Sequence, residues 1–302
     1  MPFRARRRLL KGMIFGNAKG RFVAFCAACA LACAAVACWG VFVEPNRLTE
    51  TRLRVPVASW AGTDKRALLA VAGDFHFAPG DEARAERIAA ALAAADPDAV
   101  LLLGDFAKGH SRAASMEPRE IAVRFRELAA RVPVFAVLGN HDAYVGSRAV
   151  AEALRESGVR VFDGKGACVA TLRNGVRVAF GGTLDPHGYF SEFDADWVPR
   201  RPAEAGAETP FVLLSHSPDV APFLNETVDL AVCGHTHGGQ ICFPGGVPVT
   251  TSCRGVGRAF IAGLFRVPGA GTPLFVTRGL GTSIVPARLF CPPEIAFLEL
   301  AP

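Results

Sequence analysis

Short apolar runs alternate with amphipathic segments along the chain after residue 65. Three runs lack polar residues and have the length of buried strands: 67–72, 99–103 and 134–138. Three segments with helical spacing follow them: 81–95, 118–131 and 147–157. Buried strands that alternate with helices predict a mostly parallel sheet covered by helices.

The pattern changes after residue 165. Residues 168–173 and 176–180 flank Asn174-Gly175, which is a strong signal for a β-hairpin. Short buried strands are predicted again at 211–214 and 230–233. We expect strands of a second, largely antiparallel sheet at 260–267, 274–277 and 295–300. Residues 184–209 contain three prolines and no regular pattern, so we expect a substrate-facing insertion there.

Residues 22–43 form a stretch of 22 residues without a charge, which is long enough to cross a bilayer as a helix. Seven basic residues and no acidic residue precede it: Arg4, Arg6, Arg7, Arg8, Lys11, Lys19 and Arg21. Because positively charged segments resist translocation, we expect the N-terminus in the cytoplasm and the body outside it. The sequence thus predicts a single-pass membrane protein.

Two other interpretations of this segment stay open. Residues 6–11 resemble a twin-arginine export signal and 35–37 resemble a small-residue cleavage site, as in a signal that is removed. Lys19 and Arg21 interrupt the apolar stretch of such a signal, which favours a retained anchor. The third interpretation is a buried helix of a soluble core.

The net charge of +5 comes from the N-terminal segment, since without its seven basic residues it becomes −2. A slightly acidic body without a basic stripe argues against nucleic acid as a partner. The five cysteines outside the apolar segment are scattered, which predicts neither a disulfide framework nor a zinc ribbon. We divide the chain into a basic cytoplasmic tail, a transmembrane anchor, a linker and one domain: 1–21, 22–43, 44–65 and 66–302.

Five polar motifs stand at the ends of predicted strands and contain five of the seven histidines. They are Asp74-Phe75-His76, Gly104-Asp105, Gly139-Asn140-His141-Asp142, Ser215-His216 and Gly234-His235-Thr236-His237. Because loops at the carboxyl ends of strands gather at one edge of a sheet, we expect these motifs to converge. Asp, Asn and His together are the ligands that a pair of divalent cations requires. Each motif alone fits a capped turn or a core histidine, but five together do not.

The order of these motifs resembles the calcineurin-like metallophosphoesterase superfamily. The form Gly-His-Thr-His-Gly-Gly-Gln at 234–240 resembles its membrane-associated bacterial branch of YkuE- and YaeI-like proteins. The resemblance covers residues 66–300 and implies an α/β fold, a four-layer α/β/β/α sandwich of mixed sheets flanked by helices, here with an N-terminal transmembrane helix. It also implies two metal ions, held by Asp74, His76 and His237, by Asn140, His216 and His235, and by Asp105 as a bridge.

Histidine, carboxylate and amide ligands suit Mn, Fe, Zn or Co better than Mg or Ca. The resemblance implies that water activated between the ions attacks phosphorus, and that His141 contacts the phosphate and protonates the leaving oxygen. Asp142 either orients His141 or a neighbouring ligand, or it caps a helix. His110 and His187 have no such setting, and we interpret them as surface or loop histidines, with contact to substrate as the less favoured alternative.

We therefore expect a membrane-anchored, dinuclear-metal phosphohydrolase of phosphodiester or pyrophosphate bonds. The anchor favours a lipid-linked substrate, because it holds the site near lipid head groups. One alternative is a UDP-2,3-diacylglucosamine pyrophosphatase of lipid A synthesis, whose cytoplasmic nucleotide conflicts with the orientation predicted above. Another is a non-catalytic metal-binding envelope protein, although neither a ligand nor the acid histidine is missing.

Overall fold

The computed structural model describes residues 3–109, 111–188 and 191–302, with side chains from residue 19 onwards. His110, interpreted above as a surface or loop histidine, lies outside the described residues. The side chains of the basic tail before residue 19 lie outside them too.

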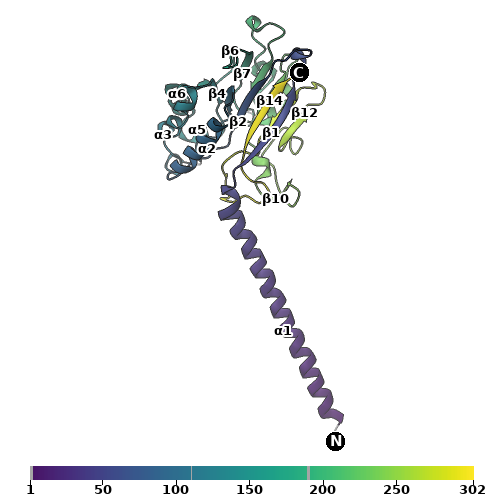
Figure 1. The fold of residues 1–302 in the computed structure, drawn as a ribbon. Helices are drawn as coiled ribbons and strands as arrows, with labels where there is room; N and C mark the ends of the chain where they lie inside the picture. The colour runs from purple at the N-terminus through teal and green to yellow at the C-terminus, as the bar shows by residue number, and fades with distance from the viewer. Residues whose placement is uncertain (1–2, 110, 189–190) are drawn as a thin grey trace.

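The first of two six-stranded sheets has the strand order β1-β14-β2-β3-β4-β5 (Figure 1). Its strands are β1 (Thr49–Pro56), β14 (Glu294–Ala301), β2 (Ala67–Ala72), β3 (Ala99–Leu102), β4 (Val134–Val137) and β5 (Arg160–Phe162). The strands β2 to β5 are parallel, and β14 runs antiparallel to β2. The three apolar runs predicted as buried strands therefore lie side by side, with their carboxyl ends at one edge.

The second sheet has the order β12-β13-β9-β8-β7-β6. Its strands are β12 (Gly263–Arg266), β13 (Pro273–Val276), β9 (Leu230–Cys233), β8 (Phe211–Leu214), β7 (Arg177–Gly182) and β6 (Gly166–Thr171). Strands β6 and β7 form the predicted antiparallel hairpin, while β7, β8, β9 and β13 are mutually parallel. The edge strand β12 is antiparallel to β13.

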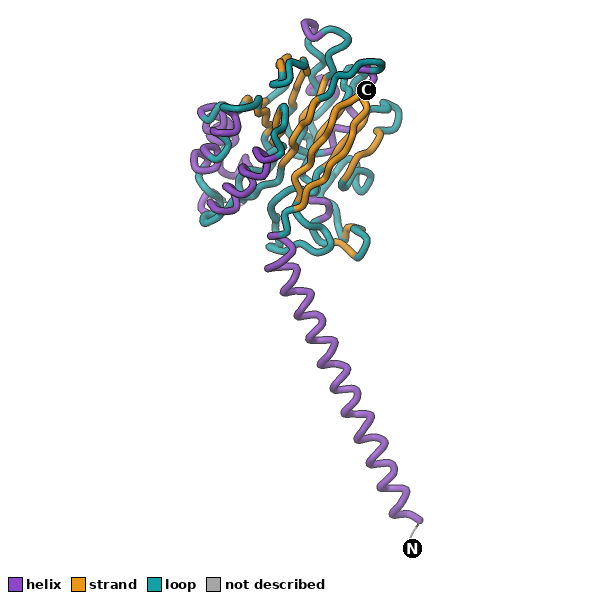
Figure 2. The backbone as a smooth tube through the Cα atoms, in the orientation of Figure 1, coloured by secondary structure: helices purple, strands orange, loops and turns teal. Residues whose placement is uncertain are grey.

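Helices cover the outer face of the first sheet (Figure 2). They are α2 (Glu82–Ala94), α3 (Pro118–Val123), α4 (Arg126–Ala129), α5 (Asp142–Val145) and α6 (Ser147–Glu156). Apolar side chains of both sheets, such as Leu101 and Val232, form the core between them. Loops and short 3-10 helices cover the outer face of the second sheet, where Val220 packs on Phe211. The predicted mixed α/β sandwich of two sheets is confirmed, and its fourth layer is mostly irregular.

Within the segment interpreted as a linker, Thr49–Pro56 forms the edge strand β1, which pairs in parallel with β14. Its side chains alternate between half-buried and exposed over most of its length, and Glu50, Arg52 and Arg54 point to solvent. Charged residues are typical of sheet edges, where they discourage pairing with other chains. This polarity made the strand resemble a linker in the sequence.

The prediction that 295–300 belongs to a second, largely antiparallel sheet is wrong. These residues lie in β14 of the first sheet, and the second sheet has more parallel than antiparallel pairs. A run that is buried on both faces, as β14 is, fits the middle of either sheet, so its pattern does not select one. The single helix predicted at 118–131 is also wrong, because it is broken into α3 and α4 at Arg124–Phe125. At the break, Phe125 is fully buried against Phe75.

A long N-terminal helix, α1 (Phe3–Cys38), leaves the body and is followed by a π-helical turn, Trp39–Val43, and the 3-10 turn Glu44–Asn46 (Figure 1). Lys19–Asn46 is long and apolar enough to cross a membrane, with a mean hydropathy of 2.3 in its most apolar window, none of which is buried in the molecule. A buried core helix is therefore not what this segment forms. Its length and its place near the N-terminus fit an anchor or a signal sequence.

Candidate metal centre

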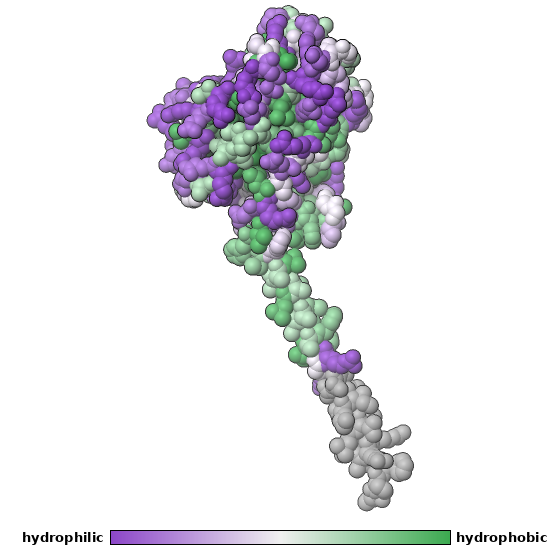
Figure 3. Space-filling model, viewed as in Figure 1, coloured by the Kyte–Doolittle hydropathy of each residue, from purple (hydrophilic) through white to green (hydrophobic). Residues whose placement is uncertain are grey.

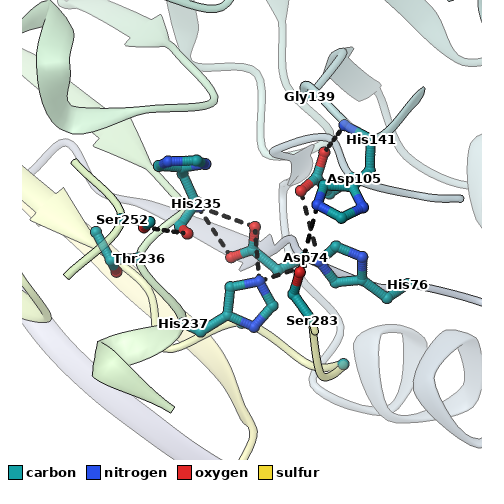
Figure 4. Close-up of polar contacts among 12 residues, drawn as sticks. Asp74, His76, Asp105, Gly139, His141, His235, Thr236, His237, Ser252 and Ser283 are labelled. Atoms are coloured by element: carbon teal, nitrogen blue, oxygen red, sulfur yellow. Dashed lines mark hydrogen bonds and ion pairs between the residues drawn. The ribbon is translucent and has the colours of Figure 1, made fainter. Parts of the chain in front are cut away.

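The five polar motifs of the sequence converge on one site, and both sheets contribute to it (Figure 4). Asp74, Asp105 and Asn140 follow the parallel strands β2, β3 and β4 of the first sheet. His216 follows β8 of the second sheet, and the pair His235 and His237 follows β9: these three histidines face the first group across the sandwich. The site thus lies where the carboxyl ends of strands from two sheets meet.

Five of these residues adopt a left-handed backbone conformation, with φ between 46° and 69°: Asp74, His76, Asp105, His235 and His237. Residues other than glycine rarely take this conformation, and when they do they cluster at functional sites. The turns leave little space, since a Cβ atom at Gly139 would overlap the Asp105 carboxylate. The glycines beside the motifs therefore permit the close approach of these loops.

The first group of ligand atoms comes from Asp74, His76, Asp105 and His237, all buried and within 4.8 Å of one another. Nε2 of His76 lies 3.0 Å from Nε2 of His237 and 3.4 Å from Oδ2 of Asp105. Two imidazole nitrogens at this distance need a shared proton or a cation between them. Four converging donors of this kind form a candidate metal site.

The second group comes from Asp105, His216 and His235, again buried and within 4.8 Å of one another. Nε2 of His216 lies 3.4 Å from Oδ2 of Asp105 and 3.3 Å from Nδ1 of His235. It also lies 3.2 Å from the amide oxygen of Asn140. Asp105 is the one residue common to both groups, and its Oδ2 atom faces a histidine of each.

The protonation of these histidines fits a metal site. Burial lowers the pKa of His76 to about 3 and holds the pKa values of His235 and His237 well below the ordinary range. Neutral imidazoles are the form that binds a metal. Nε2 of His235 and Nδ1 of His237 are buried and have no hydrogen-bond partner among the described residues. Neutral nitrogen donors beside carboxylates and an amide oxygen fit Mn, Fe, Zn or Co.

The buried carboxylates of Asp74 and Asp105 lie close together although their negative charges repel each other. Burial raises the pKa of Asp74 to about 7. Burial acts on Asp105 in the same direction, but the charge and hydrogen bond of His216, together with the charge of His76, hold the pKa of Asp105 well below its usual range. Burial lowers the pKa of His216, but the charge and hydrogen bond of Asp105, together with the charges of Asp185 and Asp74, raise it well above its ordinary value. A site that needs positive charge to keep two buried carboxylates ionised is suited to cations.

Asp142 is fully buried and holds the loop that carries Asp105. Its carboxylate accepts hydrogen bonds from the backbone N–H groups of Asp105 (3.0 Å), Ala107 (3.0 Å) and Gly139 (2.9 Å). The alternative of a helix cap does not apply, because His141 occupies the N-cap position of α5 and Asp142 is already its first residue. Asp142 therefore ties the loop after β3 to the loop after β4.

His141 faces the pocket beside the two ligand groups. Its Nδ1–H donates to the Lys108 carbonyl oxygen at 2.9 Å, which directs Nε2 toward the hydroxyl of Ser283 at 3.3 Å. Its backbone N–H donates to Oδ1 of Asp105 at 2.8 Å. The ring meets that of His76 edge-on, with centroids 4.6 Å apart. His141 thus has one ring nitrogen anchored and the other turned toward the site.

The interpretation of His187 as a surface or loop histidine misses its position in the site. It does lie in a loop, but its ring centroid is 4.1 Å from that of His235 and its side chain is only 16% exposed. Its Nδ1 atom lies 3.7 Å from Oδ2 of Asp219. The sequence signal was Asp185-Pro186-His187 shortly after β7, which is a strand end like those of the five motifs.

A pocket of about 470 Å³ opens over these groups. Its polar floor includes Asp105, His141 and His187, and its apolar wall includes Val249, Ile284 and Val285. The side chain of Gln240 fixes the wall, since it donates to the carbonyl oxygens of Ser283 (3.0 Å) and Val285 (2.9 Å). The pocket therefore combines an ionic site with an apolar surface. His187, which belongs to the irregular segment 184–209, lines this pocket.

A buried cluster of histidines and carboxylates at the rim of two mixed sheets fits the site of a metal-dependent phosphoesterase. Residues 67–239 match the calcineurin-like phosphoesterase family, and the chain belongs to this family. The resemblance noted from the motifs is thus confirmed.

Several curated relatives are similar to this chain. Phosphodiesterase YaeI of Escherichia coli (strain K12) is 30% identical over 211 residues, which cover 68% of this chain and 70% of YaeI. An uncharacterized metallophosphoesterase of Aquifex aeolicus is 27% identical over 238 residues, covering 76% of this chain and 83% of the relative. The metallophosphoesterase YkuE of Bacillus subtilis is 37% identical over 90 residues, or 30% of each chain.

Proposed function

We propose that this phosphoesterase is a membrane-anchored, dinuclear-metal hydrolase of phosphodiester or pyrophosphate bonds. The observation that carries the proposal is Asp105, whose carboxylate is common to two groups of buried metal-binding side chains. Asp105 would be a ligand of both divalent cations, and six further residues would hold them: Asp74, His76 and His237 for one, Asn140, His216 and His235 for the other. Mn, Fe, Zn or Co suits this set.

When bound, the two cations would supply charge for the phosphoryl oxygens and lower the pKa of an attacking water. The chain's own residues orient the reaction. Asp142 fixes the loop of Asp105 through three backbone N–H groups, which keeps the bridging carboxylate in place. The buried floor of the pocket, with Asp105 1% and His141 7% exposed, limits competing water.

His141 is the proposed proton donor to the leaving oxygen. Its Nδ1–H donates to the Lys108 carbonyl oxygen, so Nε2, which lies 3.3 Å from the Ser283 hydroxyl, is the ring nitrogen turned toward the pocket. Histidine is the side chain that most often serves as a general acid or base. In this proposal Asp142 acts on His141 only through the loop that both residues share.

We propose a lipid-linked phosphoester as the substrate, with residues 22–43 as the anchor and the catalytic domain outside the cytoplasm. The apolar span of α1 and the apolar wall of the pocket support this choice. A UDP-2,3-diacylglucosamine substrate would instead require the domain on the cytoplasmic side. Reporter fusions after residue 60 test the topology: periplasmic activity supports the proposal, and cytoplasmic activity contradicts it.

Hydrolysis of bis(p-nitrophenyl) phosphate by the full-length chain tests the reaction. Asp105→Asn and His141→Ala should each lower kcat at least about a hundredfold, because one removes the bridge and the other the acid. Asp194→Asn, a change of an exposed carboxylate on a 3-10 turn, is the control and should keep full activity. Circular dichroism checks that the variants fold.

Turnover like that of the unmutated chain in both variants would refute the mechanism. Absence of turnover by the unmutated chain would leave a metal-binding role without catalysis as the remaining explanation of the site. A panel of nucleotide-sugar lipid, phospholipid, cyclic nucleotide and DNA then identifies the substrate class. Preference for DNA would contradict the proposal, since the body lacks a basic stripe.

A further inference from the structure

Two loops at the end of the body nearest α1 expose apolar side chains and no charge. Residues 240–253 and 279–293 contain a single charged residue, Arg288, and it is fully buried, whereas 20% of the chain is charged. The exposed apolar side chains of these loops form what we call the apolar rim: Phe243, Val247, Val249, Ile284, Val285 and Phe290. Loops in water are rarely so free of charge.

The apolar rim is one continuous surface. Strand β10 (Cys242–Phe243) pairs with β11 (Val247–Pro248), which sets Phe243 opposite Val247. On the other side of β10, the N–H of Cys242 donates to the Leu289 carbonyl at 2.9 Å, next to Phe290. Three neighbouring segments therefore present their apolar side chains together.

The backbone of the apolar rim is strained at two of its most exposed positions. Ile284 has a φ of 61° and is 86% exposed, and Phe290 has a φ of 51° and is 48% exposed. A β-branched residue in this region is a rare outlier that persists only where the surroundings impose it. For Ile284 they do, since Gln240 binds the backbone of both Ser283 and Val285. An isoleucine held out into solvent at this cost indicates an apolar partner.

The end of the membrane span is attached directly to this surface. The N–H of Arg288 donates to the Gly40 carbonyl at 2.8 Å, and the N–H of Cys291 donates to Glu44 at 2.6 Å. Glu44 is itself buried and accepts the indole N–H of Trp39 at 2.7 Å. No flexible segment therefore separates the described end of the span from the loop that carries Phe290.

The length of the span places the membrane surface at this junction. The 22 uncharged residues 22–43 extend about 33 Å as a helix, close to the roughly 30 Å of a bilayer core. Trp39, 43% exposed, stands at the end of the span, where indole rings favour the interface. Figure 3 shows the hydrophobic surface of the helix continuing up to the body, and Figure 1 shows β10 at that same end.

We propose that the apolar rim docks into the surface of the bilayer that α1 spans, so that the pocket opens at the lipid head groups. Val249, Ile284 and Val285 belong to both the apolar rim and the pocket wall, which joins the membrane surface to the metal centre. The ligand class is a membrane lipid with a phosphoester in its head group. The inference rests on the proposed anchoring of α1, and the docking itself requires no catalysis.

Tryptophan quenching in phosphatidylcholine vesicles tests docking on the full-length chain. Phe243→Trp should add emission that phosphatidylcholine brominated on its acyl chains quenches, after subtraction of the signal from the native tryptophans. Leu264→Trp on β12, which lies farther from α1 (Figure 1), is the matched control and should add emission that is not quenched. Equal quenching of both, or of neither, would overturn the inference whether or not the enzyme is active.

Paired substrates then test the consequence for the reaction. In the same vesicles, Phe243→Ser/Phe290→Ser should lower turnover of phosphatidyl-p-nitrophenol about tenfold, because two apolar contacts with lipid are lost. These two residues stand outside the pocket lining, so turnover of the soluble bis(p-nitrophenyl) phosphate should stay unchanged. Leu264→Ser should change neither rate.

The outcomes separate the two proposals. Absence of turnover of both substrates by the unmutated chain refutes the proposed function and leaves the quenching result to decide the docking. Normal turnover of both substrates by the double variant, without quenching at position 243, refutes the docking alone. A dimer that dissociates in Phe243→Ser/Phe290→Ser would assign the apolar rim to a second copy of the chain, and so would also refute it.

Discussion

Asp105 shows how much of the site depends on one residue. Its Oδ1 atom accepts the backbone N–H of His141, while its Oδ2 atom lies 3.4 Å from both His76 and His216. Its own left-handed conformation, with a φ of 53°, places the carboxylate between the two groups. A single side chain thus joins the two candidate groups of metal ligands and holds the backbone of the proposed acid.

The buried histidines predict how stability of the metal-free protein depends on pH. Burial lowers the pKa of His76 from 6.5 to about 3, so the unfolded chain binds more protons between these values. Its contribution to stability is therefore complete above pH 6.5 and is lost as the pH falls toward 3. His76→Gln removes this dependence.

Urea unfolding of the metal-free chain in detergent, with a chelator present, measures this pH dependence of stability at pH 6.5 and pH 5. Between these pH values the unmutated chain should lose about 2 kcal/mol more of its unfolding free energy than His76→Gln does. Asp74, whose pKa burial raises to about 7, acts with the opposite sign but is present in both proteins. Equal losses would show that His76 is protonated as readily in the folded as in the unfolded chain.

At the scale of elements, Asp142 joins the loops that follow β3 and β4. Asp142→Ala leaves three buried N–H groups without their acceptor and should destabilise the protein by about 2–4 kcal/mol. Because the loop of Asp105 is then loose, metal affinity should fall roughly 10–100-fold. Urea unfolding and metal competition measure the two effects.

Asp194→Ala is the matched control for this prediction. Asp194 also accepts a backbone N–H, that of Asp196 at 2.8 Å, but it is exposed and is not part of the pocket lining. Asp194→Ala should lower the free energy of unfolding by about 0.5–1 kcal/mol and leave metal affinity unchanged. If Asp142→Ala behaved like Asp194→Ala, Asp142 would not hold the metal loops.

The elements also show what a sequence can predict. The strands before Asp74, Asp105 and His235 were predictable because continuous apolar runs end in polar turns. Strand β1 was not, since an edge strand with alternating charges has the composition of a linker. His187 was missed for a related reason: its position against His235 depends on how the two sheets pack, which no local pattern records.

At the scale of the whole molecule, the metal centre joins the two sheets at their strand ends. Asp74 and Asp105 come from the first sheet and His216 and His235 from the second, so the site exists only when the sandwich is assembled. The motifs predicted this convergence, because parallel strands share an edge. They did not predict the sheet to which β14 belongs, since a fully buried run suits either.

The most direct test of the dinuclear centre is electron paramagnetic resonance of the full-length chain loaded with Mn²⁺. We predict two bound ions per chain with the spectrum of an exchange-coupled pair, because the proposed centre shares Asp105 between them. In Asp105→Ala the coupling should disappear while at least one ion can still bind. A single uncoupled ion in the unmutated chain, at saturating Mn²⁺, would contradict the bridge.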